Sequence, residues 1–288
     1  MRPDNRITAY ENEIKVLKCV GLFAHLRYIE VGRIVWPNST WRVAQQMAER
    51  TVTRLINNDE LVQTPNSLGS NSILLTKKGV ATLHELDIEA TYHGPDSSAV
   101  NGEQFRHRSF ETRYLVERIA QGHTAFGSYA IAKKWAPINR QQFVKWHEKI
   151  PDGLVQVPGI ERGHKNSAYR IVDGIEVENS RKSGAELDGI LDIAWKIGTF
   201  LDKAETVLLD RVVFVCDAAK GHKKRIENAL ERYMSTHPLN NRALLSSIVL
   251  CQCRVSRPFV WHDYDETDCY SLINVAMPTI EDPDVGDD

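Results

Sequence analysis

The chain has 288 residues, of which 42% are hydrophobic and 26% charged, with a formal net charge of −2. A domain usually holds roughly 100 to 200 residues, so this length predicts two domains, and no stretch approaches the roughly 20 apolar residues that cross a bilayer. The five cysteines form neither a disulfide framework nor a paired CxxC zinc motif. The N-terminus lacks an apolar signal sequence, and both observations favour a cytoplasmic location.

Residues 1–91 are predicted to form a winged helix-turn-helix domain. Hydrophobic spacing predicts helices over 7–20 and 26–35, and a third helix that opens at Ser39 or Thr40 and runs to Ile56. Two short strands, 61–64 and 72–75, flank a tip rich in Gly, Asn and Ser, and a short helix follows from Thr76.

The third helix carries the candidate DNA contacts. Its inward side is expected to hold Val43, Met47, Leu55 and Ile56. The residues left outside suit phosphate oxygens and base edges in a major groove: Arg42, Gln45, Gln46, Arg50, Thr53 and Arg54. The alternative is a winged helix used for protein contacts, with merely solvated arginines.

A linker over 92–102 combines Gly, Pro, Ser and Asn without hydrophobic periodicity, and a second domain is expected over 103–275. Strands and helices alternate there, which predicts an α/β domain with a mixed sheet flanked by helices in a chain that is α+β overall. The expected helices are 105–120, 186–205 and 220–234, and the expected strands are 154–157, 168–179, 211–216 and 245–255, where Cys251 and Cys253 pack one face. An acidic tail over 276–288 is expected to be disordered and solubilising, or to hold a partner.

Three acids of the second domain form a candidate metal site. Glu176 and Glu178 lie two apart on a predicted strand and therefore share a face, while Ile175 and Val177 share the opposite, buried face. Asp152 ends a preceding segment and completes the cluster. Carboxylate oxygens favour Mg²⁺ or Mn²⁺, which serve phosphodiester cleavage in nucleases. A solvated sheet face is the alternative for the Glu-x-Glu pair.

Further residues are candidates for the same pocket or for the DNA backbone. Arg181 and Lys182 follow the strand and suit a phosphate, whereas Glu111 and His107 on helix 105–120 are additions for which a surface position is the alternative. Basic side chains elsewhere could track a DNA backbone or simply be solvated: Lys133, Lys134, Arg140, Lys145, Lys223, Lys224 and Arg225.

The order acid, strand, Glu-x-Glu, helix, strand is similar to the PD-(D/E)XK nuclease-like fold, here with Pro151-Asp152 and Glu176-Val177-Glu178. Together with the winged helix, it resembles the replication-relaxation and MobC-type mobilisation relaxases of plasmids. The resemblance implies a protein that binds a transfer origin on duplex plasmid DNA and nicks one strand. It also implies single-stranded DNA after nicking, relaxosome accessory or coupling proteins as partners, and Asp152, Glu176, Glu178 and Lys182 as catalytic residues.

The chain departs from that pattern at Glu178, where lysine is usual, and Lys182 is the candidate replacement. This departure keeps a second hypothesis open, a non-catalytic winged-helix accessory protein or transcriptional repressor with a degenerate nuclease-like domain. A third hypothesis is an ordinary restriction or repair nuclease, which would break both strands. No tyrosine has a spacing that marks it for a covalent DNA link.

Overall fold

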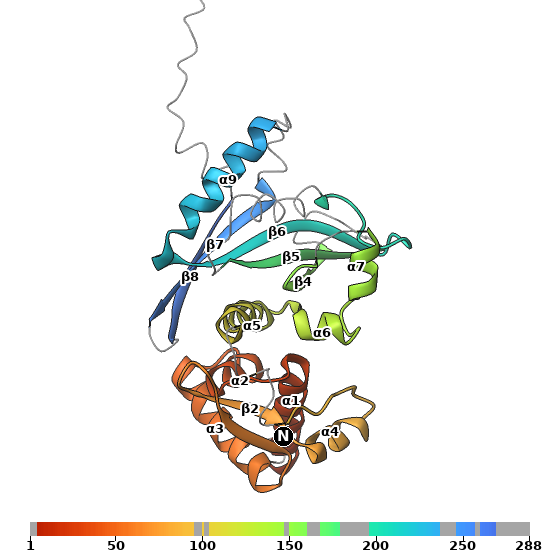
Figure 1. Ribbon diagram of the computed structural model, residues 1–288. Helices are drawn as coiled ribbons and strands as arrows, with labels where there is room; N and C mark the ends of the chain where they lie inside the picture. Colours follow the sequence, from red (N-terminus) through yellow and green to blue (C-terminus); the bar gives the residue numbers. More distant parts are fainter. Residues whose placement is uncertain are drawn as a thin grey trace, which may run out of the picture.

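The computed structural model describes residues 5–94, 100, 104–146, 150–159, 168–178, 196–236, 246–256 and 260–268. These residues form a mixed α+β structure (Figure 1). None of the described helices combines the length and the apolar character that a membrane span requires. The tail 276–288 and most of the predicted linker, 95–99 and 101–102, fall outside the described residues.

The N-terminal unit contains helices and one hairpin, close to the order expected from the sequence. The strands β1 and β2 pair antiparallel, with Leu61 opposite Leu75. Leu26, between the first two helices, forms an isolated antiparallel bridge to Ile73 and adds a short third segment to the hairpin. The elements are α1 (Asn5–Phe23), α2 (Tyr28–Val35), α3 (Trp41–Asn57), β1 (Leu61–Pro65), β2 (Asn71–Leu75) and α4 (Lys77–His84).

The second unit contains a six-stranded mixed sheet in the order β3-β4-β5-β6-β7-β8. Strands β3, β4 and β5 are antiparallel neighbours, β5, β6 and β7 are parallel, and β8 returns antiparallel. Its elements are α5 (Phe105–Ala120), β3 (Thr124–Gly127), α6 (Ser128–Ala132), α7 (Arg140–Trp146), β4 (Gly153–Val157), β5 (Arg170–Glu178), β6 (Val207–Asp217), η3 (Ala218–Lys220), α9 (His222–Thr236), β7 (Ile248–Ser256) and β8 (Val260–Asp268).

The two faces of the sheet are both buried, which explains why the central strands read as nearly continuous apolar runs. One face packs against α5 through Val155, Ile175, Val177, Val213, Val215 and Cys251. The other packs against α9 through Val172, Leu209, Phe214, Ile248 and Leu250. Cys251 and Cys253 share the α5 face, as the alternation predicts, with their sulfur atoms 3.9 Å apart.

Helix α5 lies between the N-terminal helices and the sheet (Figure 1). Every residue from 109 to 117 is buried, so this helix has no solvent face over two turns. Phe110, Tyr114 and Leu115 belong to one hydrophobic core that also contains Val16 and Leu55 of the N-terminal unit. The two units therefore meet through a shared core.

Three parts of the second unit differ from the sequence prediction. The helix predicted over 186–205 is wrong for its described part, because 196–205 forms turns and Phe200 bridges Leu208. Gly198 has a left-handed φ of +80°, and the Asp202 carboxylate accepts bonds from Thr206 N and Val207 N, so local contacts replace helical ones. Residues 186–195 lie outside the described residues. Strands β3 and β8 and the short helices α6 and α7 were not predicted.

Candidate functional site

A stripe of polar side chains runs along the exposed side of α3. Arg42, Gln46 and Arg50 are spaced four residues apart and all three are exposed. Residues at this spacing share a helix face, and eight residues rise about 12 Å, close to the width of the DNA major groove. Within the described part of the chain neither arginine forms an ion pair. We name these three residues the α3 stripe.

The other predicted contacts of α3 are engaged within the protein. Gln45 is half-buried and donates to the Glu49 carboxylate over 2.8 Å. Thr53 is exposed, but its hydroxyl donates to the Glu49 carbonyl over 2.7 Å. Arg54 pairs with Glu13 of α1 at 2.8 Å. The α3 stripe is thus a narrower surface than the set of six residues predicted from the sequence.

Close packing against α2 fixes the orientation of α3. A Cβ on Gly32 would lie 2.7 Å from the Ala44 carbonyl oxygen, so the two helices approach at a point where only glycine fits. Ala44 and Ala48 are buried on this side, whereas Val43 is 45% exposed. The prediction that Val43 faces inward is wrong, because the buried side is centred on small residues. The other three residues predicted to face inward do so in part: Leu55 is buried, and Met47 and Ile56 are half-buried.

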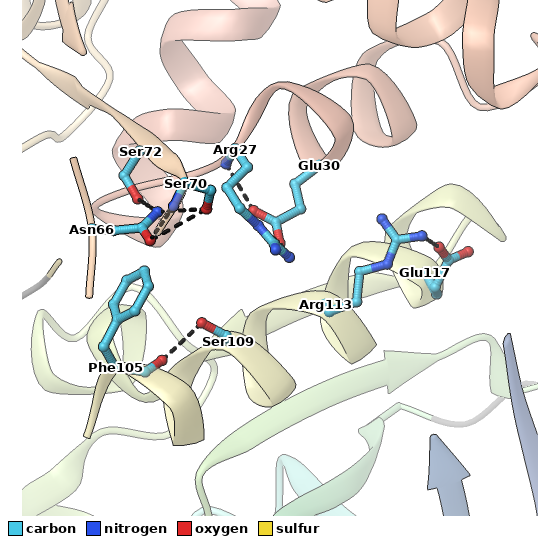
Figure 2. A network of polar contacts seen from close by, with 9 residues as sticks. All are labelled: Arg27, Glu30, Asn66, Ser70, Ser72, Phe105, Ser109, Arg113 and Glu117. Atoms are coloured by element: carbon cyan, nitrogen blue, oxygen red, sulfur yellow. Dashed lines mark hydrogen bonds and ion pairs between the residues drawn. The ribbon is translucent and has the colours of Figure 1, made fainter. Parts of the chain in front are cut away.

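The hairpin tip is held by the side chain of one residue. The Asn66 carbonyl oxygen accepts from Leu68 N at 3.0 Å and from Ser70 N at 3.3 Å, which closes an Asx turn. The Asn66 amide nitrogen donates to the buried Ser72 hydroxyl over 3.0 Å. Gly69 supplies the left-handed φ of +76° that the turn needs. Figure 2 shows Asn66 with Ser70 and Ser72.

The remaining predicted DNA contacts lie elsewhere on the molecule. Lys133 and Lys134 are exposed just after α6. Lys224 is exposed on α9, and Lys223 lies 3.8 Å from Glu227 on the same helix. Helices α3 and α9 lie at opposite ends of the molecule in Figure 1. The lysines of α9 therefore do not extend the α3 stripe into one continuous surface.

Asp152 lies at the junction of three elements, directly before β4. Its Oδ2 accepts from the backbone N–H of Val177 in β5 over 2.8 Å. Its Oδ1 lies 3.2 Å from Nε2 of His107 in α5. The structure thus brings together two of the predicted site residues, Asp152 and His107, from segments 45 positions apart in the chain.

Glu111 lies one helical turn beyond His107 and is buried. The alternative reading of Glu111, a glutamate on the protein surface, is therefore wrong. Its Oε1 accepts from the backbone N–H of Ser128 at 2.7 Å, and the Ser128 hydroxyl lies 3.1 Å from each carboxylate oxygen. Burial raises the pKa of Glu111 to about 7, the Asp152 charge adds to the rise, and the Ser128 bonds and His107 oppose it. Gly127 leaves room for this carboxylate, since a Cβ there would lie 2.5 Å from Oε1.

Glu176 and Glu178 are buried as well, each 2% exposed. Ile175 and Val177 belong to the core on the α5 face of the sheet. Because side chains alternate along a strand, the two glutamates point to the opposite face, where Glu178 lies in register with Cys216 of the α9-side core. The predicted alternation is confirmed, whereas the alternative of a solvated sheet face for this pair is wrong, because both side chains are buried.

The described residues do not fit a divalent ion as they are placed. Within the described ranges, no three His, Cys, Asp or Glu side chains come together as a ligand set. Asp152 is bonded toward α5, whereas Glu176 and Glu178 point to the other face of the sheet. Arg181 and Lys182 lie outside the described residues. No catalytic step through a metal ion follows from this arrangement.

A polar network at the junction of the two units was not anticipated. Arg33 of α2 lies 2.9 Å from Glu117 of α5, which also pairs with Arg113 at 2.5 Å. Burial would raise the pKa of Glu30, but the charge and hydrogen bonds of Arg27, with Arg113 nearby, lower it overall. Figure 2 shows the Arg27–Glu30 pair on α2 and the Arg113–Glu117 pair on α5. The i,i+3 and i,i+4 spacings are visible in the sequence, whereas the Arg33–Glu117 contact has no local signal.

Comparisons with protein-family models, with curated proteins and with solved structures returned no significant match.

Proposed function

We propose that this protein binds duplex DNA, with its N-terminal unit acting as a winged helix and α3 lying in the major groove. The observation that carries the proposal is the α3 stripe, in which two arginines and a glutamine follow one exposed helix face. Arginine pairs with the O6 and N7 atoms of guanine, and glutamine with the N6 and N7 atoms of adenine. The neighbouring hairpin, with its Asn66-closed tip, supports the same assignment.

Two residues beside the α3 stripe, Trp41 and Glu49, also suit contacts with DNA bases. Trp41, at the start of α3, is 68% exposed, and an apolar side chain at a helix N-terminus suits the methyl group of thymine or a sugar. Glu49 is exposed on the same helix, and its carboxylate, which accepts one bond from Gln45, keeps further lone pairs that suit the cytosine amino group. A mixed surface of this kind favours recognition of a particular DNA sequence over binding by charge alone.

The test begins with selection of a duplex from a random library, followed by fluorescence anisotropy on the selected site. Arg42→Ala and Arg50→Ala should each lower the affinity by about 1 to 3 kcal/mol, the value of a base contact. Lys18→Ala removes an exposed basic residue from α1 and should leave the affinity unchanged. If all three variants bind the duplex with the affinity of the native protein, α3 does not read the DNA and the proposal is wrong.

Salt dependence separates base contacts from phosphate contacts. If Arg42 or Arg50 neutralises a phosphate, the slope of log K against log salt should become shallower by about 0.9 in the alanine variant. A base contact instead lowers the affinity with little change in slope and relaxes the preference for one base pair. Loss of affinity without either signature would indicate that the variant disturbs the helix.

A second candidate is the origin-specific nicking expected of a MobC-type relaxase. It is supported by the order α5, then the antiparallel strands β3, β4 and β5, then the parallel β6, with Asp152 directly before β4 and Glu176 and Glu178 on β5. That candidate requires Mg²⁺ or Mn²⁺. Since the acids do not converge on an ion as placed, nicking ranks behind DNA binding, and a non-catalytic accessory protein or repressor is its direct competitor.

The selected duplex, cloned into a supercoiled plasmid, distinguishes these candidates in Mg²⁺ or Mn²⁺ buffer. A relaxase should yield nicked circles, and Asp152→Asn, Glu176→Gln or Lys182→Ala should abolish nicking while leaving duplex affinity intact. Linear product would indicate a restriction or repair nuclease. A protein that binds its site and never cuts would be an accessory protein or a repressor.

A further inference from the structure

A cavity of about 350 Å³ lies between the N-terminal unit and α5. Its walls come from the segment that joins α1 to α2, from His93, from α5, and from the turn between β3 and α6. Its volume is at the lower end of the about 300 to 1,000 Å³ that small-ligand sites occupy. The cavity is separate from the α3 stripe, because none of its lining residues belongs to α3.

Aromatic rings form part of the cavity wall. His25 is 5% exposed and packs its ring on Phe105 with a centroid distance of 5.1 Å. Its Nδ1 is buried and has no hydrogen-bond partner among the residues that the structure describes. His93 and Tyr129 meet edge to face at 5.0 Å and share a hydrogen bond of 2.8 Å between Nε2 and the hydroxyl. Phe23 also lines the cavity, so that four residues with rings, Phe23, His25, His93 and Tyr129, contribute to its wall. Such walls favour a flat ring as the ligand.

Two groups of opposite charge character face the same cavity from α5. Glu111 contributes a buried carboxylate, and Arg108 contributes a guanidinium whose Nη2 lies 3.4 Å from the Gln104 side chain. These residues are three apart on a helix, which places their Cβ atoms about 5 to 6 Å from each other. One small ligand can therefore meet a hydrogen-bonding carboxylate at one end and a cation at the other.

We propose that this cavity binds a nucleotide. The base lies against the rings of His25, His93 and Tyr129 and presents its N–H groups to Glu111, and the phosphate meets Arg108. A nucleobase supplies both the flat ring and the N–H donors, and a guanidinium is the cation that phosphate oxygens prefer. The nucleotide is either a free monophosphate or a residue of a single DNA strand. This inference goes beyond duplex recognition and does not depend on it.

Equilibrium dialysis and calorimetry with the four ribonucleoside 5′-monophosphates, the deoxy forms and short single-stranded oligonucleotides test the proposal. At least one nucleotide should bind the full-length protein, and Arg108→Ala should weaken that binding by about tenfold or more, as expected for loss of a charge-assisted hydrogen bond. The matching nucleoside, which lacks phosphate, should bind the native protein and Arg108→Ala equally. Binding by mononucleotides indicates a free ligand, and binding by oligonucleotides alone indicates a DNA strand; either result supports the cavity as a nucleotide site.

The matched control is Arg232→Ala, which removes an exposed arginine from α9 and should leave nucleotide binding unchanged. Tyr129→Phe keeps the ring and removes only the hydroxyl, so it should retain most of the binding, whereas Tyr129→Ala should lose it. Circular dichroism and thermal melting select the variants that remain folded. The proposal is overturned if no nucleotide binds, if inorganic phosphate competes as well as the nucleotide, or if folded Arg108→Ala and Tyr129→Ala bind like the native protein.

Discussion

At the residue scale, His25 shows how burial makes one side chain sensitive to pH. The pKa of His25 falls from 6.5 to about 4; burial is the largest cause, Glu30 opposes it, and the charges of Arg108, Arg27 and His93 add to it. The folded state therefore holds a neutral imidazole while the unfolded chain takes up a proton below pH 6.5. The contribution of His25 to the free energy of unfolding should therefore be highest above pH 6.5 and should decrease as the pH falls from 6.5 toward 4.

Urea unfolding at pH 7 and pH 5 measures this contribution. The two pKa values imply a loss of about 2 kcal/mol between these conditions from His25 alone. His25→Gln should reduce the pH dependence of the free energy of unfolding by that amount, whatever its effect at pH 7. His262→Gln, which removes an exposed histidine from β8, serves as the control for the loss of a histidine side chain. An unchanged slope in His25→Gln would show that the imidazole is protonated equally in both states.

At the element scale, the contact between α2 and α3 depends on the absence of one side chain. Gly32→Ala would place a Cβ 2.7 Å from the Ala44 carbonyl oxygen and 2.8 Å from its carbonyl carbon, both backbone atoms that cannot rotate away. The helices must separate, and overpacking of this kind costs about 1 to 3 kcal/mol. Since α3 carries the α3 stripe, Gly32→Ala should lower both the midpoint of thermal unfolding and the affinity for duplex DNA.

Gly94→Ala is the matched control, because the nearest atom to its Cβ would be the Tyr92 hydroxyl at 3.8 Å, an ordinary contact. Thermal unfolding and DNA-binding anisotropy are measured for both variants. The comparison separates the general effect of replacing a glycine by alanine from the specific effect of a Cβ atom between α2 and α3. Equal midpoints for Gly32→Ala and Gly94→Ala would mean that α2 and α3 can shift apart without cost.

At the scale of the whole molecule, α5 joins the two units into one core. The core on its two sides is continuous, and the Arg33–Glu117 pair and the His93–Tyr129 hydrogen bond cross the same junction. Neither unit can unfold without exposing apolar surface of the other. We therefore expect one cooperative thermal transition for the full chain.

Differential scanning calorimetry tests this expectation by comparing the calorimetric and van't Hoff enthalpies, which should agree for a single transition. Glu117→Gln, which weakens pairs on both sides of the junction, should lower the midpoint of that transition without splitting it. Two separated transitions in the native protein would show that the units unfold independently and that the shared core contributes little between them.

The described helices and strands show where local sequence was sufficient. Periodicity predicted α1, α3, α5 and α9 to within a few residues at each end, and the Gly-rich tip predicted the β1–β2 hairpin. Strand β3 was missed because four residues carry too little periodicity, and β8 because its charged residues alternate without an apolar run. In 196–205, helical spacing was overruled by a left-handed glycine and the Asp202 side chain.

The candidate functional residues also fall into two groups, those predictable from local sequence and those that depend on tertiary contacts. The α3 stripe was predictable because a helix period places residues 42, 46 and 50 on one face without reference to the rest of the chain. The depth of Glu111 and the cavity beside it were not, since they depend on segments 23–25, 93 and 127–129 meeting α5. The sequence also predicted one cluster of three acids, whereas the sheet turns Glu176 and Glu178 away from the α5 face.

By itself the sequence determined the α+β class, the order of most elements, the exposed polar face of α3 and the shared face of Glu176 and Glu178, because each of these depends on spacing along one segment. Only the tertiary structure decided that α5 is buried on both sides, that Glu111 lies in a protein interior which raises its pKa to about 7, and that His107 meets Asp152. The physical reason is that burial and electrostatic environment arise from residues distant in the chain, and no local pattern records which of them become neighbours.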